Sequence, residues 1–134
     1  MISDLIRDRL IDEGVVGSAT QSGSAWVCLV GGLSDQIDAP QVAIRDTAGF
    51  SPLSSHDSRS PLRPGFQILV RGSPNSYNAT NQKAQEVWDV LHRRPFGDVV
   101  IAIDGVNNPI WLGLTSDDDR PTWSLNFVAF LIKE

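Results

Sequence analysis

The side chains best suited to metal or acid–base chemistry include a short acidic run. Asp117, Asp118 and Asp119 are consecutive, and Asp104 opens another turn. Several carboxylates in one place are typical ligands for hard cations. The run lacks the alternating spacing and terminal glutamate of a calcium-binding loop, and it stands between a strand and Pro121. This pattern favours a solvated turn over a specific metal site.

Two histidines, His56 and His92, are candidates for general-base catalysis. A catalytic histidine needs a nearby nucleophile and an orienting carboxylate. The sequence has no nucleophile-elbow, zinc-protease or phosphate-loop motif, and His92 precedes two arginines that suit a helix C-terminus. We therefore predict a protein that is not an enzyme and uses no cofactor. A small metal-dependent hydrolase built on Asp104, the acidic run and His56 is an alternative.

Composition narrows the classes of partner. The single cysteine, Cys28, lies within an apolar run, so we expect a buried core thiol. The net charge of −5 argues against a nucleic-acid coat, which needs a clustered basic surface. No apolar run approaches the ~20 residues of a membrane span, and the charged N-terminal segment is not that of a signal peptide. We expect synthesis in a cytoplasm and no membrane partner.

Periodicity predicts the elements that position these residues. Residues 1–134 fit one domain, and apolar residues at helical spacing predict helices over 3–13 and 77–92. Alternating or continuous apolar runs predict strands at 25–30, 41–46, 66–71, 99–104, 109–114 and 123–132. The run 99–104 is apolar on both sides and predicts a central strand. The turn at 104–108 predicts a hairpin with the next strand.

Small, polar and proline residues separate these elements. Residues 17–24 predict a loop. Residues 47–64 predict a longer loop, of a length typical of functional or disordered segments. The resulting order of helices and strands predicts an α+β single domain. We expect a mainly antiparallel mixed β-sheet with two helices packed on one face, together with the long Ser/Pro-rich loop.

The tryptophans indicate a surface for association. Trp111 alternates with Ile110, Leu112 and Leu114, which predicts that it points to the opposite face of the sheet. The final strand is partly apolar on both sides. Since two helices cover only one face well, we expect residual apolar surface, which marks partner sites on small proteins. The alternative is that the long loop or the first helix covers this surface.

Three pieces of sequence, in their order and spacing, resemble the minor capsid and tail-terminator (tail-completion) proteins of long-tailed bacteriophages. They are RPGFQILVRG at 63–72 with the helix after it, a two-strand unit at 103–114 that ends in a Leu-Gly pair, and DDDRPTWSLNFVAF at 117–130. The N-terminal IRDRL also recurs in this group. The resemblance covers about two-thirds of the chain and leaves out residues 47–64.

The resemblance implies a virion structural protein that caps the head-proximal end of the tail tube as a ring, usually hexameric. Such a ring stops tube polymerisation and provides the head–tail joining surface after assembly in the host cytoplasm. The implied partners are further copies of the chain, the major tail tube protein and head–tail connector (stopper or portal-side) proteins. DNA passes through the channel without specific binding. A head-completion protein on the portal side of the same particle is the alternative.

A small set of side chains is predicted to serve packing and partner contacts. The predicted interface residues are Phe66, Arg71, Trp111, Arg120, Trp123 and Phe130. The aromatic residues are expected in packing and association, and the two arginines in polar contacts between subunits or to the tube. For both arginines a solvated strand end is the alternative.

Overall fold

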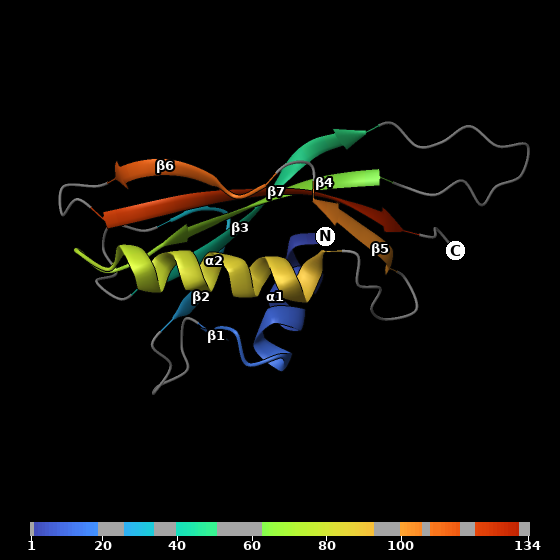
Figure 1. Ribbon diagram of the computed structural model, residues 1–134. Helices are drawn as coiled ribbons and strands as arrows, with labels where there is room; N and C mark the ends of the chain where they lie inside the picture. Colours follow the sequence, from blue (N-terminus) through green and yellow to red (C-terminus); the bar gives the residue numbers. More distant parts are fainter. Residues whose placement is uncertain are drawn as a thin grey trace, which may run out of the picture.

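The computed structural model describes residues 2–18, 26–33, 40–50, 63–92, 100–105, 108–115 and 120–131. Two helices and seven strands are present in these ranges (Figure 1). The helices are α1 (Ile2–Asp12) and α2 (Tyr77–Leu91). The strands are β1 (Gly17–Ser18), β2 (Val27–Val30), β3 (Gln41–Phe50), β4 (Arg63–Arg71), β5 (Val100–Gly105), β6 (Ile110–Thr115) and β7 (Arg120–Leu131). The predicted α+β fold class is confirmed.

The strands form one sheet in the order β1-β2-β3-β4-β7-β5, with β6 also paired to β7. The pairs β1–β2 and β2–β3 are parallel, and the other pairs are antiparallel. The sheet is therefore mixed and mainly antiparallel, as predicted. The twelve-residue β7 pairs with β4 along one side. Its other side is shared end to end by β6, along residues 120–124, and β5, along residues 127–131.

Both helices lie on one face of the sheet, as the sequence predicts (Figure 1). The α1 helix packs against β2 and β3, and α2 packs against β7, β4 and β5. In α2 the buried residues recur every three or four positions, which makes the apolar stripe that a sheet can cover. Among the described residues, no helix is both long and apolar enough to span a membrane.

An aromatic stack forms the centre of the core between α2 and the sheet. Phe66 of β4 and Phe127 of β7 are cross-strand partners, and their ring centroids lie 5.2 Å apart. The Trp88 ring of α2 lies 5.4 Å from Phe127. Burying a large apolar side chain stabilises a fold by roughly 1.5–3 kcal/mol. These rings therefore fix α2 on β4 and β7.

The C-terminal end of α2 is fastened to β5 at Gly105. The Trp88 indole lies so close that a Cβ on Gly105 would stand 2.0 Å from its Cη2 atom. The His92 ring stacks on Trp88 with centroids 4.6 Å apart, and its Nδ1 accepts a hydrogen bond of 3.0 Å from the Gly105 N–H. The sequence indicated only that His92 lies near the end of a helix. In the structure, His92 also joins α2 to β5 through these two contacts.

The predicted hairpin between residues 104 and 114 is wrong. The strands β5 and β6 pair with β7 and not with each other, so β5 lies at the margin of the sheet and not in its middle. The length of β7 explains this, because twelve residues accommodate two six-residue strands end to end. Apolar periodicity identifies a strand, but it does not identify the strand's partner.

Several predicted boundaries also shift. Residues 17–18 form β1, residues 47–50 and 63–65 extend β3 and β4, and β7 begins at Arg120. Polar residues join these strands because backbone pairing with a neighbour outweighs weak intrinsic propensity. Residues 51–62 and 116–119, which include His56 and Asp117 to Asp119, lie outside the described residues.

The buried thiol of Cys28 belongs to the core under α1. Its side chain is almost fully buried, as the sequence predicts. Burial raises the pKa of the Cys28 thiol from 9.0 to about 12, because the apolar surroundings disfavour the thiolate. The unfolded chain loses this proton near pH 9 and the folded chain only near pH 12. The resulting contribution to the free energy of unfolding is complete below pH 9 and is lost as pH rises to 12.

We predict that replacing Gly105 with alanine destabilises the protein by about 1–3 kcal/mol, because the new Cβ collides with the Trp88 ring. Thermal and urea unfolding measure the loss. Gly32→Ala is the matched control, since a Cβ there meets nothing within 4 Å. Its effect should stay within about 0.5 kcal/mol. Equal unfolding midpoints for the two variants would contradict this packing.

We predict that Cys28 resists thiol reagents in the folded protein. At pH 8, an aromatic disulfide reagent should react at least about 100-fold more slowly with the native chain than with the urea-unfolded chain, because the thiolate is the reactive form. The measurement is the release of the coloured thiol over time. Similar rates in the two states would show that the thiol is accessible.

Candidate functional site

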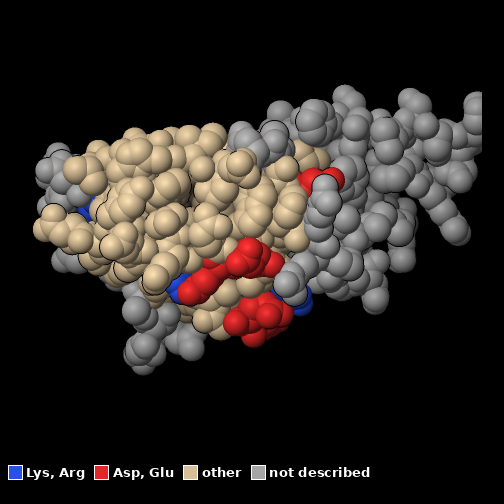
Figure 2. Space-filling model, viewed as in Figure 1, with Lys and Arg blue, Asp and Glu red and all other residues tan. Residues whose placement is uncertain are grey.

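Large apolar side chains with high exposure gather along β6. We call four of them the β6 patch; its members are Tyr77, Trp111, Leu112 and Leu114, with exposed fractions from 40% to 60%. Ile110 is 41% exposed but pairs with Ser124, so it points to the other face of the strand from Trp111. Neither β6 nor the first turn of α2 contains a charged residue. Figure 2 shows a wide uncharged surface in this region, while the acidic side chains lie elsewhere on the same face. Contiguous apolar surface of this kind is typical of an interaction site.

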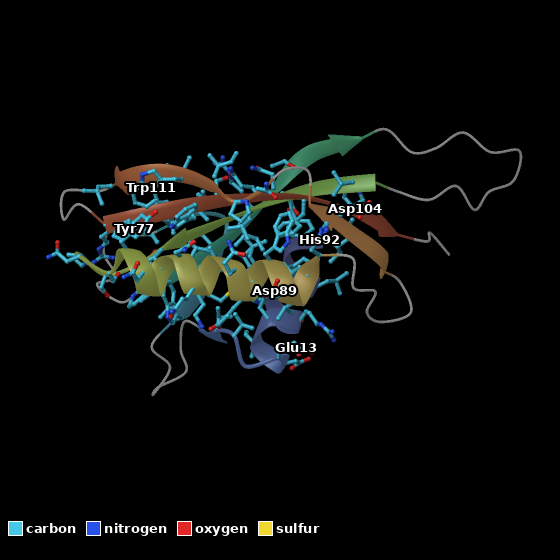
Figure 3. All side chains as sticks on the ribbon, in the orientation of Figure 1. Glu13, Tyr77, Asp89, His92, Asp104 and Trp111 are labelled. Carbon is cyan, nitrogen blue, oxygen red and sulfur yellow. The ribbon has the colours of Figure 1, made fainter. Side chains whose placement is uncertain are left out.

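The rings of the β6 patch are held in place by one another. The Tyr77 and Trp111 centroids lie 5.0 Å apart in an edge-to-face arrangement, and Figure 3 shows the two side chains together. Trp123, the cross-strand partner of Trp111, lies 5.3 Å from Trp111 and 6.1 Å from Tyr77. Each such pair contributes about 0.5–1.5 kcal/mol beyond area burial. The exposed rings are therefore ordered before any partner arrives.

A tight turn between β4 and α2 positions Tyr77. The Gly72 N–H donates to the Pro121 carbonyl of β7 at 3.0 Å. The Thr80 hydroxyl donates to the Ser76 carbonyl at 2.8 Å and lies where a Cβ on Gly72 would stand. Because α2 begins directly beside β7, its first residue meets the tryptophans of β6 and β7.

A β-bulge sets the direction of the β6 side chains. Trp111 pairs with Trp123 but Gly113 pairs with Thr122, so Leu112 is an extra residue. Gly113 has a φ of +94°, a backbone conformation that glycine adopts without strain. The bulge reverses the alternation, so that Leu114, paired with Pro121, lies on the same side as Trp111. The prediction that Trp111 and Leu114 point to opposite faces is therefore wrong.

The outer edge of β6 lies at the margin of the sheet. Within the described ranges, β6 pairs with β7 alone. An open strand edge invites pairing with other chains, and proteins restrain it with bulges and prolines. Here the bulge at Gly113 and Pro109 just before the strand do so. The β6 patch is therefore better suited to side-chain packing than to simple strand addition.

The face of the sheet away from the helices carries a row of polar side chains, beside the half-buried Leu69 and the buried Val128. Arg45 donates to Gln67 at 2.5 Å, and Gln67 donates to Ser124 at 2.8 Å. Asn126 extends this chain of hydrogen bonds to Ser124 at 3.4 Å. Most of the exposed large apolar residues in the described ranges therefore lie on β6 and at the beginning of α2.

The predicted interface residues occupy three different environments. Trp111 belongs to the β6 patch and Trp123 lies partly buried beside it. Phe66 is fully buried in the core, so it contributes to packing. Phe130 lies in β7, and its side chain is outside the described residues.

The two arginines of the predicted set are not solvated strand ends. The exposed fractions of Arg71 and Arg120 are 4% and 3%. Arg71 pairs with Thr122 across β4 and β7, and the Thr122 hydroxyl donates to the Arg120 carbonyl at 3.2 Å. Both arginines therefore lie close together within the fold. A role of either side chain in partner contacts stays a prediction.

Sequence reasoning did not place Tyr77, Ile110, Leu112 or Leu114 in the predicted interface. The sequence did contain a signal for exposed apolar residues on this strand. Residues 110–114 are apolar at nearly every position, whereas a strand with only one buried face needs an apolar residue at every second position. Tyr77 could not be found this way, since its position beside β6 depends on the turn into α2.

Few groups of catalytic type come together in the described ranges. Asp104 is exposed on β5, and His92 is stacked on Trp88. No three His, Cys, Asp or Glu side chains among the described residues form a group that could hold a metal ion. The exposed aromatic rings of the β6 patch contact one another, an arrangement that suits binding to another protein.

Comparison with known proteins gives a likeness in fold. No protein-family model matches the sequence, and a search of curated proteins gives no match. Among solved structures, the chain is similar to one from a structure described as the "Virion of native gene transfer agent (GTA) particle". The TM-score is 0.63 at 12% sequence identity, over 96% of this chain and 92% of that chain. At this identity the match establishes a shared fold.

Proposed function

We propose that this chain is a structural subunit of a phage-like virion and that it caps the head-proximal end of the tail tube as a ring. The observation that carries the proposal is the β6 patch, an ordered and uncharged apolar surface at the margin of an acidic molecule. The likeness in fold to a chain of a gene transfer agent virion, over nearly the whole of both chains, supports it. So does the resemblance of three sequence segments to tail-terminator proteins.

The arrangement of the β6 patch fits a permanent structural contact. Ordering flexible side chains at an interface costs about 0.5–1.5 kcal/mol for each side chain. Tyr77 and Trp111 are already fixed by their mutual contact and by Trp123. Aromatic residues held in this way are typical anchors of protein interfaces. The affinity of the patch therefore depends on area and shape and not on a folding step.

The charge of the chain fits a ring through which DNA slides. A net charge of −5 repels the phosphate backbone, so DNA gains no adhesion from the subunit as a whole. The ring then binds its protein partners through apolar contact: further copies of itself, the tail tube and the connector on the head side. Among the described residues, no three His, Cys, Asp or Glu side chains form a group that could hold a metal ion.

Purified particles and a tube-growth assay test the proposal. The chain should be present in particles purified from the producing cells, and electron microscopy should locate it between tube and head. Added to tail-tube subunits encoded by the same genome, it should stop tube growth at a defined length. Density on the portal side of the neck would favour the head-completion alternative. Absence from the particle would overturn the proposed function.

We predict that Leu114→Glu weakens capping and leaves the fold intact. Leu114 is 60% exposed, so a charge there costs little in the free protein, but it would be buried without a partner in an interface. Half-maximal tube capping should require at least about tenfold more protein. Tube lengths measured by electron microscopy report the loss, and circular dichroism reports the fold.

The matched control for this prediction is Gln82→Glu. Gln82 is also exposed and accepts the same charge, but it lies on α2 outside the β6 patch. This variant should cap tubes like the unchanged protein. If Leu114→Glu capped equally well, the β6 patch would have no part in assembly.

A further inference from the structure

We infer that the bond between Asp104 and Gly105, at the end of β5, is a site of spontaneous isomerisation to isoaspartate, and that β7 and His92 hold it in the unreacted form. Among aspartates, one that precedes glycine is the most prone to this reaction, because glycine has no side chain to hinder its backbone nitrogen. The sequence contains no other Asp-Gly pair and no Asn-Gly pair. Asp104 is exposed, so solvent reaches its carboxyl group.

The reaction needs only water and the two residues themselves. The Gly105 nitrogen attacks the Cγ atom of the protonated Asp104 carboxyl. An N–Cγ bond forms, and the carboxyl hydroxyl and the proton of the nitrogen leave together as water. Water then adds to one of the two carbonyls of the resulting five-membered ring. Opening at the main-chain carbonyl gives isoaspartate, in which Gly105 is attached through Cγ, and opening at the other carbonyl restores aspartate.

Pairing in the sheet opposes closure of this ring. Asp104 pairs with Val128 and Gly105 pairs with Phe127, so both lie in an extended strand. Closure requires rotation about the Cα–C bond of Asp104 out of the extended conformation, which turns the peptide plane out of the strand. The end of β5 must therefore open before the reaction. Among the described strands β5 pairs with β7 alone, and opening at a margin costs less than opening in the middle of a sheet.

A hydrogen bond from α2 adds to this protection. The Gly105 N–H donates to Nδ1 of His92 at 3.0 Å, and His92 is held in turn by its stack on Trp88. Figure 3 labels His92 at the end of α2 and Asp104 on β5. The rotation that closes the ring turns this N–H away from the imidazole, so the hydrogen bond is lost before the new bond forms. His92 is therefore a positioning residue that keeps the nitrogen away from the carboxyl.

The packing of Trp88 explains why this reactive pair is present in the fold. A Cβ at position 105 would lie 2.0 Å from the Trp88 Cη2 atom, so this contact requires glycine. Isoaspartate places one additional carbon atom in the main chain between residues 104 and 105. Gly105 is then displaced from Trp88 and from its partner Phe127. The modification therefore detaches β5 from the end of α2, and it accumulates in chains whose β5 has opened.

Incubation of the full chain at neutral pH, followed by peptide mapping, tests the inference. Isoaspartate at position 104 is measured by a fragmentation method that distinguishes it from aspartate. It should form at least about tenfold more slowly in the native chain than in the urea-unfolded chain, because β5 must open first. His92→Phe keeps an aromatic ring on Trp88 but removes the acceptor. This variant should raise the native rate roughly 2- to 10-fold, as expected for the loss of one hydrogen bond.

Two further variants are controls. Asp104→Glu should give no such product, because the larger ring closes far more slowly. Val42→Ala weakens the core on β3, away from β5 in the strand order. At an equal loss of unfolding free energy, it should raise the rate less than His92→Phe does, since it acts only through unfolding of the whole chain.

Four results would overturn the inference. Equal rates in the native and unfolded chains would show that β5 gives no protection. No isoaspartate in the unfolded chain would show that the pair is unreactive. An unchanged or slower rate in His92→Phe would show that the imidazole does not hold the nitrogen back. An equal effect of Val42→Ala at matched stability would show that the reaction proceeds through global unfolding.

Discussion

The length of β7 is the constraint on which the rest of this structure depends. Its twelve residues pair with β4 along one side and carry β6 and β5 end to end along the other. Its inward side chains meet α2 through Phe127 and Trp88. A shorter strand would leave β5 or β6 without a partner. The same strand therefore organises the core, the sheet margin and the surface proposed for assembly.

The position of β6 on the first half of β7 decides where apolar surface is left over. On the helix side of the sheet, the remaining large side chains are covered by α1 and α2. On the other side, Arg45, Gln67, Ser124 and Asn126 are joined by side-chain hydrogen bonds, so these polar groups have partners within the chain. Most of the exposed large apolar residues in the described ranges lie on β6 or at the beginning of α2, and the bulge at Gly113 places Leu114 on the same side as Trp111.

The sequence predicted the layers of the fold but not the pairing of its strands. The period of apolar residues identifies α2 and β7 because each buries one regular stripe. Pairing depends on hydrogen bonds between distant segments, which leave no period in the chain, so the position of β5 and β6 was missed. The bulge at Gly113 then changed which side chains share a face. Trp111 and Trp123 were found by residue type, and Tyr77 was missed because only the turn before α2 brings it there.

The separation of apolar and charged surface governs how such a molecule can assemble. Attraction through exposed charges weakens with salt over distances of about 8–10 Å, whereas apolar burial depends little on ionic strength. An acidic helix side and an uncharged margin therefore act in different ways. Except at high salt, the acidic helix side repels other acidic surfaces and DNA. The uncharged margin binds apolar surfaces with an affinity that depends little on salt. A subunit with both can reject most encounters by charge and retain contacts that bury its uncharged margin.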